Sequence, residues 1–447
     1  MTRAEKVRLV SMLSVPAMLA QLSSIIMQYI DAMMVGHLGA SASASIGLVS
    51  TTTWLFGGLS VSIGTGFAVM VAQHIGAKRN ERAGEILRQA ILLCFSFSLV
   101  VCLVCVGIHN SLPVWLGGEG YVAEQASSYF LVWSLMVPVM QMLHLSNGML
   151  RASGNMSVPM FLGILMCALD VGFNCIFIPR WGVTGAALAT ALAGTVCAAV
   201  SMRYLFRELP MPQRTKGGPV FEWRIVSRAL KIGLPMALEH TVFCGAQIMS
   251  TIIVAPLGTV AIAANTIGIT VESLCYMPGY GIGEAATTLI GQSIGAKRHD
   301  LIRSFSILTV VLGVAVMTLL GVVMYIFAPE LMAFMSVDAD VQTVGAEALR
   351  IEAYAEPMYA ASIVVYCIFV GAGDTLVPSI MNLCSIWMVR IPLAWFLSSR
   401  MGLSGVWMAM CIELTFRGLI FLIRLRLKRN LTPSSLREGA AKQSAGK

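Results

Sequence analysis

Acidic side chains interrupt the long apolar stretches of this sequence at Asp31, Asp170, Glu239, Glu272, Glu352 and Glu356. A carboxylate at the centre of a lipid bilayer costs roughly 2.5–3.5 kcal/mol even on the mildest scale, so such residues usually face a cavity and are paired or protonated. Removal from water favours the protonated form of a carboxyl group. This suits a group that takes up a proton on one face of a membrane and releases it on the other. These positions are therefore candidates for binding a coupling cation or a cationic ligand.

Asp170 and Asn174 lie one helical turn apart on the same face of a helix, so both side chains can reach the same cavity. A proton needs one carboxylate there, whereas Na⁺ needs several oxygen ligands, and the same cluster could supply either. A polar contact between helices is the alternative for Asp170. Glu413, with Arg417 one turn later, is expected to form a structural ion pair. Arg390 is expected to be neutralised by an acid on the tenth or twelfth apolar block.

Twelve apolar blocks must position these residues. Hydrophobic residues make up 57% of the 447-residue chain, charged residues make up 12%, and the mean hydropathy is +0.80, which excludes an ordinary soluble protein. Blocks of about 20 apolar residues can cross a bilayer as helices, and these blocks lack the alternation of barrel strands. We expect helices near residues 10–35, 46–70, 87–110, 125–150, 158–178, 183–206, 229–255, 262–290, 303–327, 346–370, 378–398 and 403–427. The first block is too long for a signal peptide and recurs mid-chain.

The net charge of +8 reflects membrane topology rather than nucleic-acid binding. In the twelve-helix arrangement 25 of the 30 Lys and Arg residues fall on one side, which predicts that this side and both termini are cytoplasmic. No nucleic-acid motif accompanies the charge. The 11 cysteines lie in apolar blocks without the spacing of disulfides or metal sites, so we interpret them as packing residues.

The second half of the chain repeats the first at one constant offset along the sequence. "AQHIGAKR" ends at Arg79 and "GQSIGAKR" at Arg298, and the segments 13–79 and 232–298 share 18 identities in 67 positions. A one-residue insertion later pairs "WGVTGA" with "MGLSGV". We predict an N-terminal six-helix lobe at 1–206, a cytoplasmic linker at 207–228, a C-terminal six-helix lobe at 229–427 and a cytoplasmic tail at 428–447.

Six helices per half give both halves the same orientation. Parallel repeats of this kind are a transporter architecture, with substrate held between halves that move against each other. The acids differ between the halves: Asp31 aligns with Ser250, and Asp170 aligns with Val389 or Arg390, depending on where the insertion falls. This favours a division in which one half binds a coupling ion and the other helps to bind substrate. Duplication for stability alone is the alternative.

No motif for catalysis or for ATP use is found. The sequence lacks a P-loop and a GxSxG elbow, "EHTVF" is not HExxH, and the six histidines have no ligand spacing. We therefore expect a transporter without a cofactor rather than an enzyme or a primary pump. Acids attract cations, and aromatic rings can stack on flat cations. For substrate binding we single out Gln28, Trp54, Glu239, Glu272 and Tyr276. Ordinary packing is the alternative for the aromatic residues.

Several motifs agree in order and spacing with one known family. "DAMMVGHLG", the twice-used "GQSIGAKR" element, "RASGNMSVP" with its partner "GAGDTLVP", and "WMVRIPLAW" resemble the multidrug and toxic compound extrusion (MATE) family across residues 10–427. The resemblance implies a V-shaped twelve-helix fold of two lobes and alternating access. It also implies export of bulky, often cationic organic compounds against inward H⁺ or Na⁺. Asp31 matches the family's helix 1 aspartate, which implies cation coupling in the N-terminal lobe.

The sequence departs from the family pattern in both halves. One branch has an Asn followed one turn later by an Asp on helix 5, whereas here Asp170 precedes Asn174. The sodium-coupled branch places acids on helices 7 and 10, at positions that are Phe243 and Tyr359 here. Glu239, one turn after the helix 7 proline, resembles the acid of another bacterial branch. A C-lobe sodium site is therefore expected to be absent, which favours coupling through the N-terminal lobe and favours protons.

The sequence predicts an all-α, multi-pass protein of the bacterial inner membrane. The expected function is efflux of small organic compounds by a monomer in the lipid bilayer, with H⁺ favoured over Na⁺ as the coupling ion. A flippase of lipid-linked saccharides and a dedicated metabolite exporter stay open as alternatives. A membrane-embedded enzyme and a structural or receptor-like protein are disfavoured, because catalytic spacing is missing and because such proteins need no unmatched acids in duplicated helices.

Overall fold

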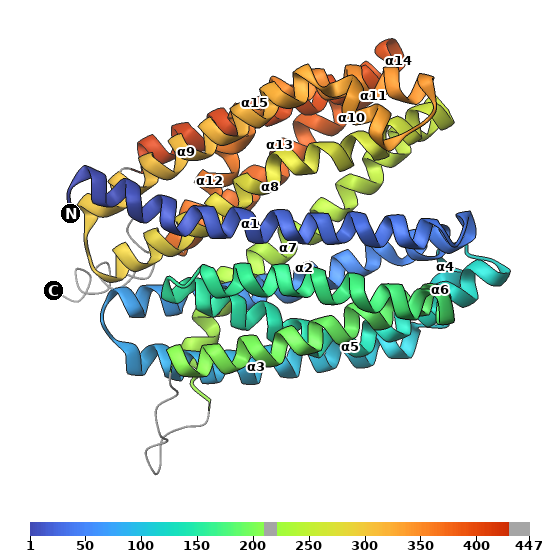
Figure 1. The fold of residues 1–447 in the computed structure, drawn as a ribbon. Coiled ribbons are helices and arrows are strands. Elements are labelled where there is room, and N and C mark those ends of the chain that lie inside the picture. Colours follow the sequence, from blue (N-terminus) through green and yellow to red (C-terminus); the bar gives the residue numbers. More distant parts are fainter. Residues whose placement is uncertain (210–220, 429–447) are drawn as a thin grey trace. The chain divides into compact units, whose positions relative to one another are not determined.

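The computed structural model describes residues 1–209 and 221–428, and its ordered elements in these ranges are all helical (Figure 1). Half of the predicted linker at 207–228 and nearly all of the predicted tail at 428–447 lie outside the described residues. The helices are α1 (Arg3–Gly36), α2 (Ala40–Gly76), α3 (Asn80–Ile108), α4 (Ser111–Trp115), α5 (Gly120–Ser153), α6 (Ser157–Glu208), α7 (Trp223–Val254), η1 (Ala255–Leu257), α8 (Thr259–Gly295), α9 (His299–Ile326), α10 (Ala328–Met335), α11 (Ala339–Ala353), α12 (Glu356–Ala372), α13 (Leu376–Ser385), η2 (Ile386–Arg390), α14 (Ile391–Met401) and α15 (Leu403–Leu427).

Each of the twelve apolar blocks falls on helix, which confirms the predicted all-α membrane fold class. Within the described ranges nine helices are long and apolar enough to cross a bilayer, or ten if the bent pair α11–α12 forms one span. Two of the nine, Ser157–Glu208 and Leu376–Leu427, are 52 residues long. Each of these is interrupted by a glycine with non-helical backbone angles, so each supplies two of the expected segments.

The repeat extends to the backbone conformation. Gly182 has φ 56° and ψ −131°, and Gly402, its counterpart in the second half, has φ 60° and ψ −136°. A positive φ of this kind is readily adopted by glycine alone, because it has no Cβ. Lys78 and Lys297, which also correspond in the repeat, share φ values of 57° and 55° at the turns that follow α2 and α8. The two halves are therefore built on the same backbone plan.

A π turn, η2, absorbs the one-residue insertion in the second half. Pro159 and Pro378 keep the offset of the earlier repeat pairs, whereas Gly182 and Gly402 lie one position further apart, so the extra residue enters between these pairs. A π turn holds one more residue than an α turn, and Ile386–Arg390 is such a turn. Residues after the turn pair at the longer offset, and at that offset Arg390, the last residue of the turn, pairs with Asp170.

The segment predicted as one helix over 346–370 is instead broken. Helices α11 and α12 meet at an angle of 59° between Ala353 and Glu356. Pro357 sits in the first turn of α12, where its missing N–H is tolerated. Its repeat partner Pro138 lies inside α5 without a break. The connections that precede α5 and α11 also contain the short helices α4 and α10, which the sequence did not predict.

The chain forms two compact units whose boundaries fall inside α1 and α7. One unit comprises residues 22–240, and the other comprises residues 1–21 and 241–447. In the first unit α5 packs against α2, α3 and α6 (Figure 1). In the second unit α12 packs against α8, α9 and α15. The first part of α1 thus belongs to the unit of the second repeat, and the first part of α7 belongs to the unit of the first repeat. The predicted lobe boundaries, 1–206 and 229–427, follow the sequence repeat rather than these compact units, and they stay a prediction.

Glycine residues allow the first parts of α1 and α7 to pack closely against α8 and α2. A Cβ on Gly66 of α2 would lie 2.2 Å from the Ala229 carbonyl oxygen of α7, and a Cβ on Gly233 of α7 would lie 2.7 Å from the Ser62 carbonyl oxygen of α2. In the other unit a Cβ on Gly281 of α8 would lie 2.6 Å from a backbone atom of α1. Close backbone approach at glycine is typical of helix pairs in membranes.

Candidate functional site

Two carboxyl groups and one amide meet in the unit formed by residues 22–240. The Asn174 side-chain Nδ2 donates to Asp31 Oδ1 at 2.7 Å and to Asp170 Oδ2 at 3.0 Å. Asp170 and Asn174 lie one turn apart on α6, and Asp31 lies on α1. One amide group therefore bridges the two carboxyl groups.

Burial divides this cluster into an inner and an outer part. Asp170 and Asn174 are fully buried, whereas Asp31 is half-buried. Tyr129 of α5 is close enough to interact electrostatically with both carboxyl groups. It packs against two clusters of buried residues, one from α2 to α5 and one from α1, α2 and α6. Sequence reasoning missed Tyr129, because its partners are distant along the chain and a tyrosine in an apolar helix carries no distinctive signal.

The cluster has acceptor atoms left over. Within the described residues, Asp170 Oδ1 and Asn174 Oδ1 are buried and have no hydrogen-bond partner. An unsatisfied buried polar atom typically costs about 1–3 kcal/mol and calls for an explanation such as a missing proton, ion or water. Oxygen acceptors beside two carboxyl groups can hold a proton or a small hard cation. No group of three or more His, Cys, Asp or Glu side chains with metal-site geometry occurs in the described part of the chain.

A second charged cluster lies in the other unit around Glu413 of α15, which is fully buried. Arg390 donates to Glu413 Oε2 from Nε at 3.0 Å and from Nη2 at 2.7 Å, and Ser385 Oγ donates to Oε1 at 2.6 Å. Arg417 Nε lies 3.2 Å from Oε1 but makes no hydrogen bond. The prediction that Glu413 pairs with Arg417 is confirmed. The prediction that an acid of the tenth or twelfth segment neutralises Arg390 is also confirmed, and the acid is Glu413 of the twelfth.

Two further carboxyl groups flank the break between α11 and α12. Glu352 and Glu356 are fully buried, and none of their four carboxyl oxygens has a hydrogen-bond partner among the described residues. Glu272 of α8 is 5% exposed and lies within electrostatic reach of Arg390 and Arg417. Both guanidinium groups are already engaged by Glu413. The four buried carboxyl groups Glu272, Glu352, Glu356 and Glu413 therefore outnumber Arg390 and Arg417, the two arginines described beside them.

The five predicted substrate-binding residues are divided between the two units. Gln28 and Trp54 are exposed on α1 and α2, and Glu239 is half-buried on α7, all in the unit of residues 22–240. Glu272 and Tyr276 lie on α8 in the other unit. The Tyr276 ring packs against two other tyrosine rings with centroids 6.0 and 5.7 Å away, as expected for a core aromatic residue. A role in substrate binding stays a prediction for all five.

Comparison with known proteins identifies both halves. The MatE family model matches residues 16–176 and again residues 235–396. The starts of the two matched segments are separated by the offset of the repeat and their ends by one position more, in agreement with the insertion. Similar proteins include a probable multidrug resistance protein NorM of Thermotoga maritima, which is 26% identical over 423 residues, with 92% of this chain and 90% of the relative covered. The probable multidrug resistance protein YoeA of Bacillus subtilis is 22% identical over 414 residues, with 90% and 89% covered.

Solved structures agree in fold. A mutant of the Vibrio cholerae MATE transporter VcmN superposes with a TM-score of 0.90 at 20% identity, with 96% of this chain and 99% of that chain covered. A transporter of the MOP superfamily from Pyrococcus furiosus gives a TM-score of 0.89 at 20% identity, with 95% and 96% covered. Because the family model accounts for most of both six-helix halves, this chain belongs to the MATE family of multidrug efflux transporters.

Proposed function

We propose that this chain is a secondary active exporter of organic, often cationic, compounds in exchange for inward H⁺, with Na⁺ as the less favoured coupling ion. The two lobes would alternate access to a substrate site in the bacterial inner membrane, with both termini cytoplasmic. The chain would act as a monomer and need no cofactor, as a transporter rather than an enzyme. The names of the relatives, probable multidrug resistance proteins, support this cargo class.

One observation carries the proposal: the contact of Asn174 with both Asp31 and Asp170. Two carboxyl groups held by the same amide repel each other when both are ionised, so such a pair favours binding one proton or another cation. Releasing that cation leaves two negative charges close together. Release is therefore favourable only where water or another cation can reach the two carboxyl groups. Such a site can load on one side of the membrane and release on the other.

The unequal burial of the two carboxyl groups suggests an order of events. Asp31 is half-buried and would exchange its proton with water first, while the fully buried Asp170 would pass its proton through Asp31. Asn174 would hold both carboxyl groups in place, because one amide N–H can donate to each. Two acceptor oxygens without donors, Asp170 Oδ1 and Asn174 Oδ1, could accept from a proton carrier or ligate Na⁺.

Ethidium transport by purified protein in liposomes tests this proposal, with an H⁺ gradient and an Na⁺ gradient imposed separately. We expect the H⁺ gradient to drive transport in the wild type. Asp31→Asn and Asp170→Asn should each lower the proton-driven rate at least tenfold, because an amide cannot release a proton. Asp340→Asn makes the same chemical change at an exposed aspartate of α11 and should leave the rate unchanged.

Other outcomes would redirect the assignment. A wild-type rate in Asp31→Asn would show that this residue does not couple the cation. Transport driven by Na⁺ alone would overturn the preference for protons and direct attention to Glu239 and Glu272. If neither gradient moves ethidium or a panel of other organic cations, the flippase of lipid-linked saccharides or the dedicated metabolite exporter becomes the better assignment.

A further inference from the structure

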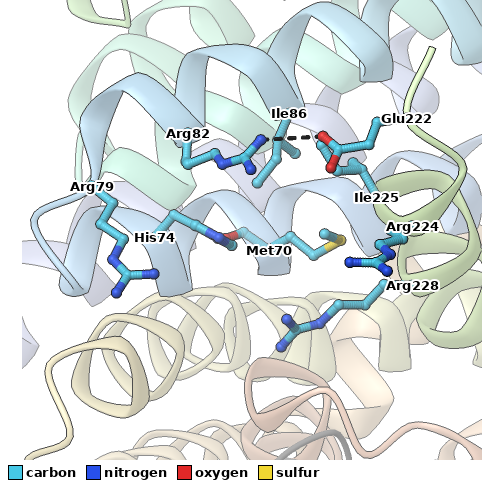
Figure 2. Close-up of a pocket in the computed structure, with 9 residues that line it drawn as sticks. All are labelled: Met70, His74, Arg79, Arg82, Ile86, Glu222, Arg224, Ile225 and Arg228. Carbon is cyan, nitrogen blue, oxygen red and sulfur yellow. Dashed lines mark hydrogen bonds and ion pairs between the residues drawn. The ribbon is translucent and has the colours of Figure 1, made fainter. Parts of the chain in front are cut away.

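A pocket of about 320 Å³ opens where α2 ends, α3 begins and α7 begins. Its charged lining consists of His74, Arg79, Arg82, Glu222, Arg224 and Arg228 (Figure 2). All of these residues belong to the unit of residues 22–240. The turn after α2 lies on the side of the membrane that the charge distribution predicts to be cytoplasmic.

The pocket carries an excess of positive charge. Four guanidinium groups line it, and Glu222 is its one acidic lining residue. That carboxylate accepts from Arg82 at 3.1 Å, and Arg82 also pairs with Glu85. Like charges gathered in one pocket repel one another, so an anion bound among them would relieve a cost that the protein otherwise bears.

The arginines differ in how far they are already engaged. Arg228 Nη2 donates to the Gln73 side-chain oxygen at 3.1 Å, a neutral partner. Within the described residues, the exposed side chains of Arg79 and Arg224 make no hydrogen bond or ion pair. Arg224 and Arg228 extend from α7 toward α2, which brings them to the side of the pocket where Met70 and His74 lie (Figure 2). Two guanidinium forks thus remain available to an anion.

The backbone adds to the positive potential of the pocket and holds its walls in place. Helices α3 and α7 both begin at the pocket, at Asn80 and Trp223, and helix N-termini favour anions. The close approach of α2 and α7 at Gly66 and Gly233 holds the two walls together. The His74 ring Nδ1 is held by the Met70 carbonyl oxygen at 2.8 Å, so its other ring nitrogen stays available.

The second repeat does not reproduce this arrangement. Arg298, the counterpart of Arg79, makes two hydrogen bonds of 2.9 Å with Asp300 and is thereby neutralised. At the offset that pairs Arg79 with Arg298, the counterparts of Arg224 and Arg228 are Glu5 and Leu9. The basic pocket is therefore not a by-product of the duplicated fold.

We propose that this pocket binds the phosphate group of an anionic ligand, with an acidic phospholipid headgroup of the cytoplasmic leaflet as the favoured source. Guanidinium forks match phosphate oxygens in pairs, and basic pockets on the cytoplasmic side of membrane helices bind such headgroups. Phe221 and Trp223 beside the pocket are 49% and 65% exposed, and their ring centroids are 6.2 Å apart. Exposed aromatic rings at a helix end are typical of the membrane interface, which is also where the phosphate groups of lipids lie.

Native mass spectrometry of the purified full chain tests the proposal. Binding of phosphatidylglycerol is compared with binding of phosphatidylcholine. In a separate arm, inorganic phosphate and pyrophosphate are titrated instead of lipid. Each basic side chain near an anionic surface contributes roughly a fivefold factor in affinity. Arg79→Gln/Arg224→Gln should therefore weaken phosphatidylglycerol binding about 25-fold. Arg79→Lys/Arg224→Lys keeps the charge and should retain most of the binding.

Arg298→Gln is the matched control, because it makes the same change at the corresponding turn, where the guanidinium is already paired. It should leave binding unchanged, and thermal unfolding should show that all variants are folded. A different outcome is that pyrophosphate or phosphate displaces the lipid and binds with an affinity that the Gln double variant weakens to a similar extent. That result would confirm the phosphate site and identify a soluble phosphate compound, rather than a lipid, as its ligand. Equal phosphatidylglycerol affinity of the wild type, the Gln double variant and the control would overturn the proposal.

Discussion

Replacing Glu413 by glutamine should destabilise the unit of residues 1–21 and 241–447 by about 3 kcal/mol, at the lower end of the cost of breaking a buried ion pair. The carboxylate is fully buried and receives two hydrogen bonds from Arg390 and one from Ser385. Removing one partner of a buried pair typically costs about 3–5 kcal/mol, because the other charge is left uncompensated. Glutamine can still accept a hydrogen bond, which returns about 1 kcal/mol of that cost.

The size of this unit sets the expected change in the midpoint of thermal unfolding. For domains of about 150–250 residues, a class that includes this unit, 1 kcal/mol shifts the Tm by roughly 2–4 °C, so Glu413→Gln should lower the Tm by about 6–12 °C. Thermal unfolding in detergent, followed by tryptophan fluorescence, measures this shift. Glu347→Gln, at an exposed position of α11, makes the same chemical change and should shift the Tm by less than about 2 °C, as surface substitutions do.

A double-mutant cycle identifies the interaction. Arg390→Gln removes the guanidinium and leaves the carboxylate with Arg417, whose Nε lies 3.2 Å away without a hydrogen bond. If the Arg390–Glu413 pair carries the stability, the double variant should be less destabilised than the sum of the two single variants, with a coupling of about 2 kcal/mol. Additive effects, or a shift for Glu413→Gln no larger than for Glu347→Gln, would refute the reasoning.

Three further experiments test the fold. Gly182→Ala should cost about 1–3 kcal/mol by Tm, because alanine is strained at φ 56° and ψ −131°; a neutral result would mean that the break in α6 is not needed. Gly66→Ala should destabilise through contact with α7, where its Cβ would lie 2.2 Å from a carbonyl oxygen, whereas Gly64→Ala, with nothing nearer than 3.8 Å, should be tolerated. Glu352→Gln and Glu356→Gln should leave the Tm unchanged or raise it, since these carboxyl oxygens have no hydrogen-bond partner among the described residues; a large loss would reveal a partner.

The sequence predicted those features that depend on local composition. About twenty apolar residues in a row predict a spanning helix whatever packs against it, and the spacing of Asp170 and Asn174 predicted a shared helix face, where the two side chains form a hydrogen bond of 3.0 Å. The contact of Asn174 with Asp31 joins two positions that are far apart in the chain. No periodicity within one helix can predict such a contact, because it depends on how α1 packs against α6.

The break between α11 and α12 shows why a residue type alone does not predict a kink. Pro138 and Pro357 correspond in the repeat, yet only α12 begins at its proline. The Gly321 backbone of α9 lies beside the break, where its Cβ would meet the Glu356 side chain at 3.1 Å. The counterpart of Gly321, at the offset that pairs the two prolines, is Cys102, a larger residue. The broken copy thus has the smaller residue on the neighbouring helix at this position.

The π turn shows how the two halves diverged in charge. At the longer offset that follows it, Arg390 pairs with Asp170, Glu413 with Ala193 and Arg417 with Cys197. In the second half a guanidinium, fixed to the chain, is neutralised by a carboxylate that the first half lacks. In the first half a carboxyl group occupies the corresponding position, and Asn174 donates to it and to a second carboxyl group. A covalently attached cation cannot leave, whereas a carboxyl pair must take its cation from solution, so the same position is structural in one half and suited to exchange in the other.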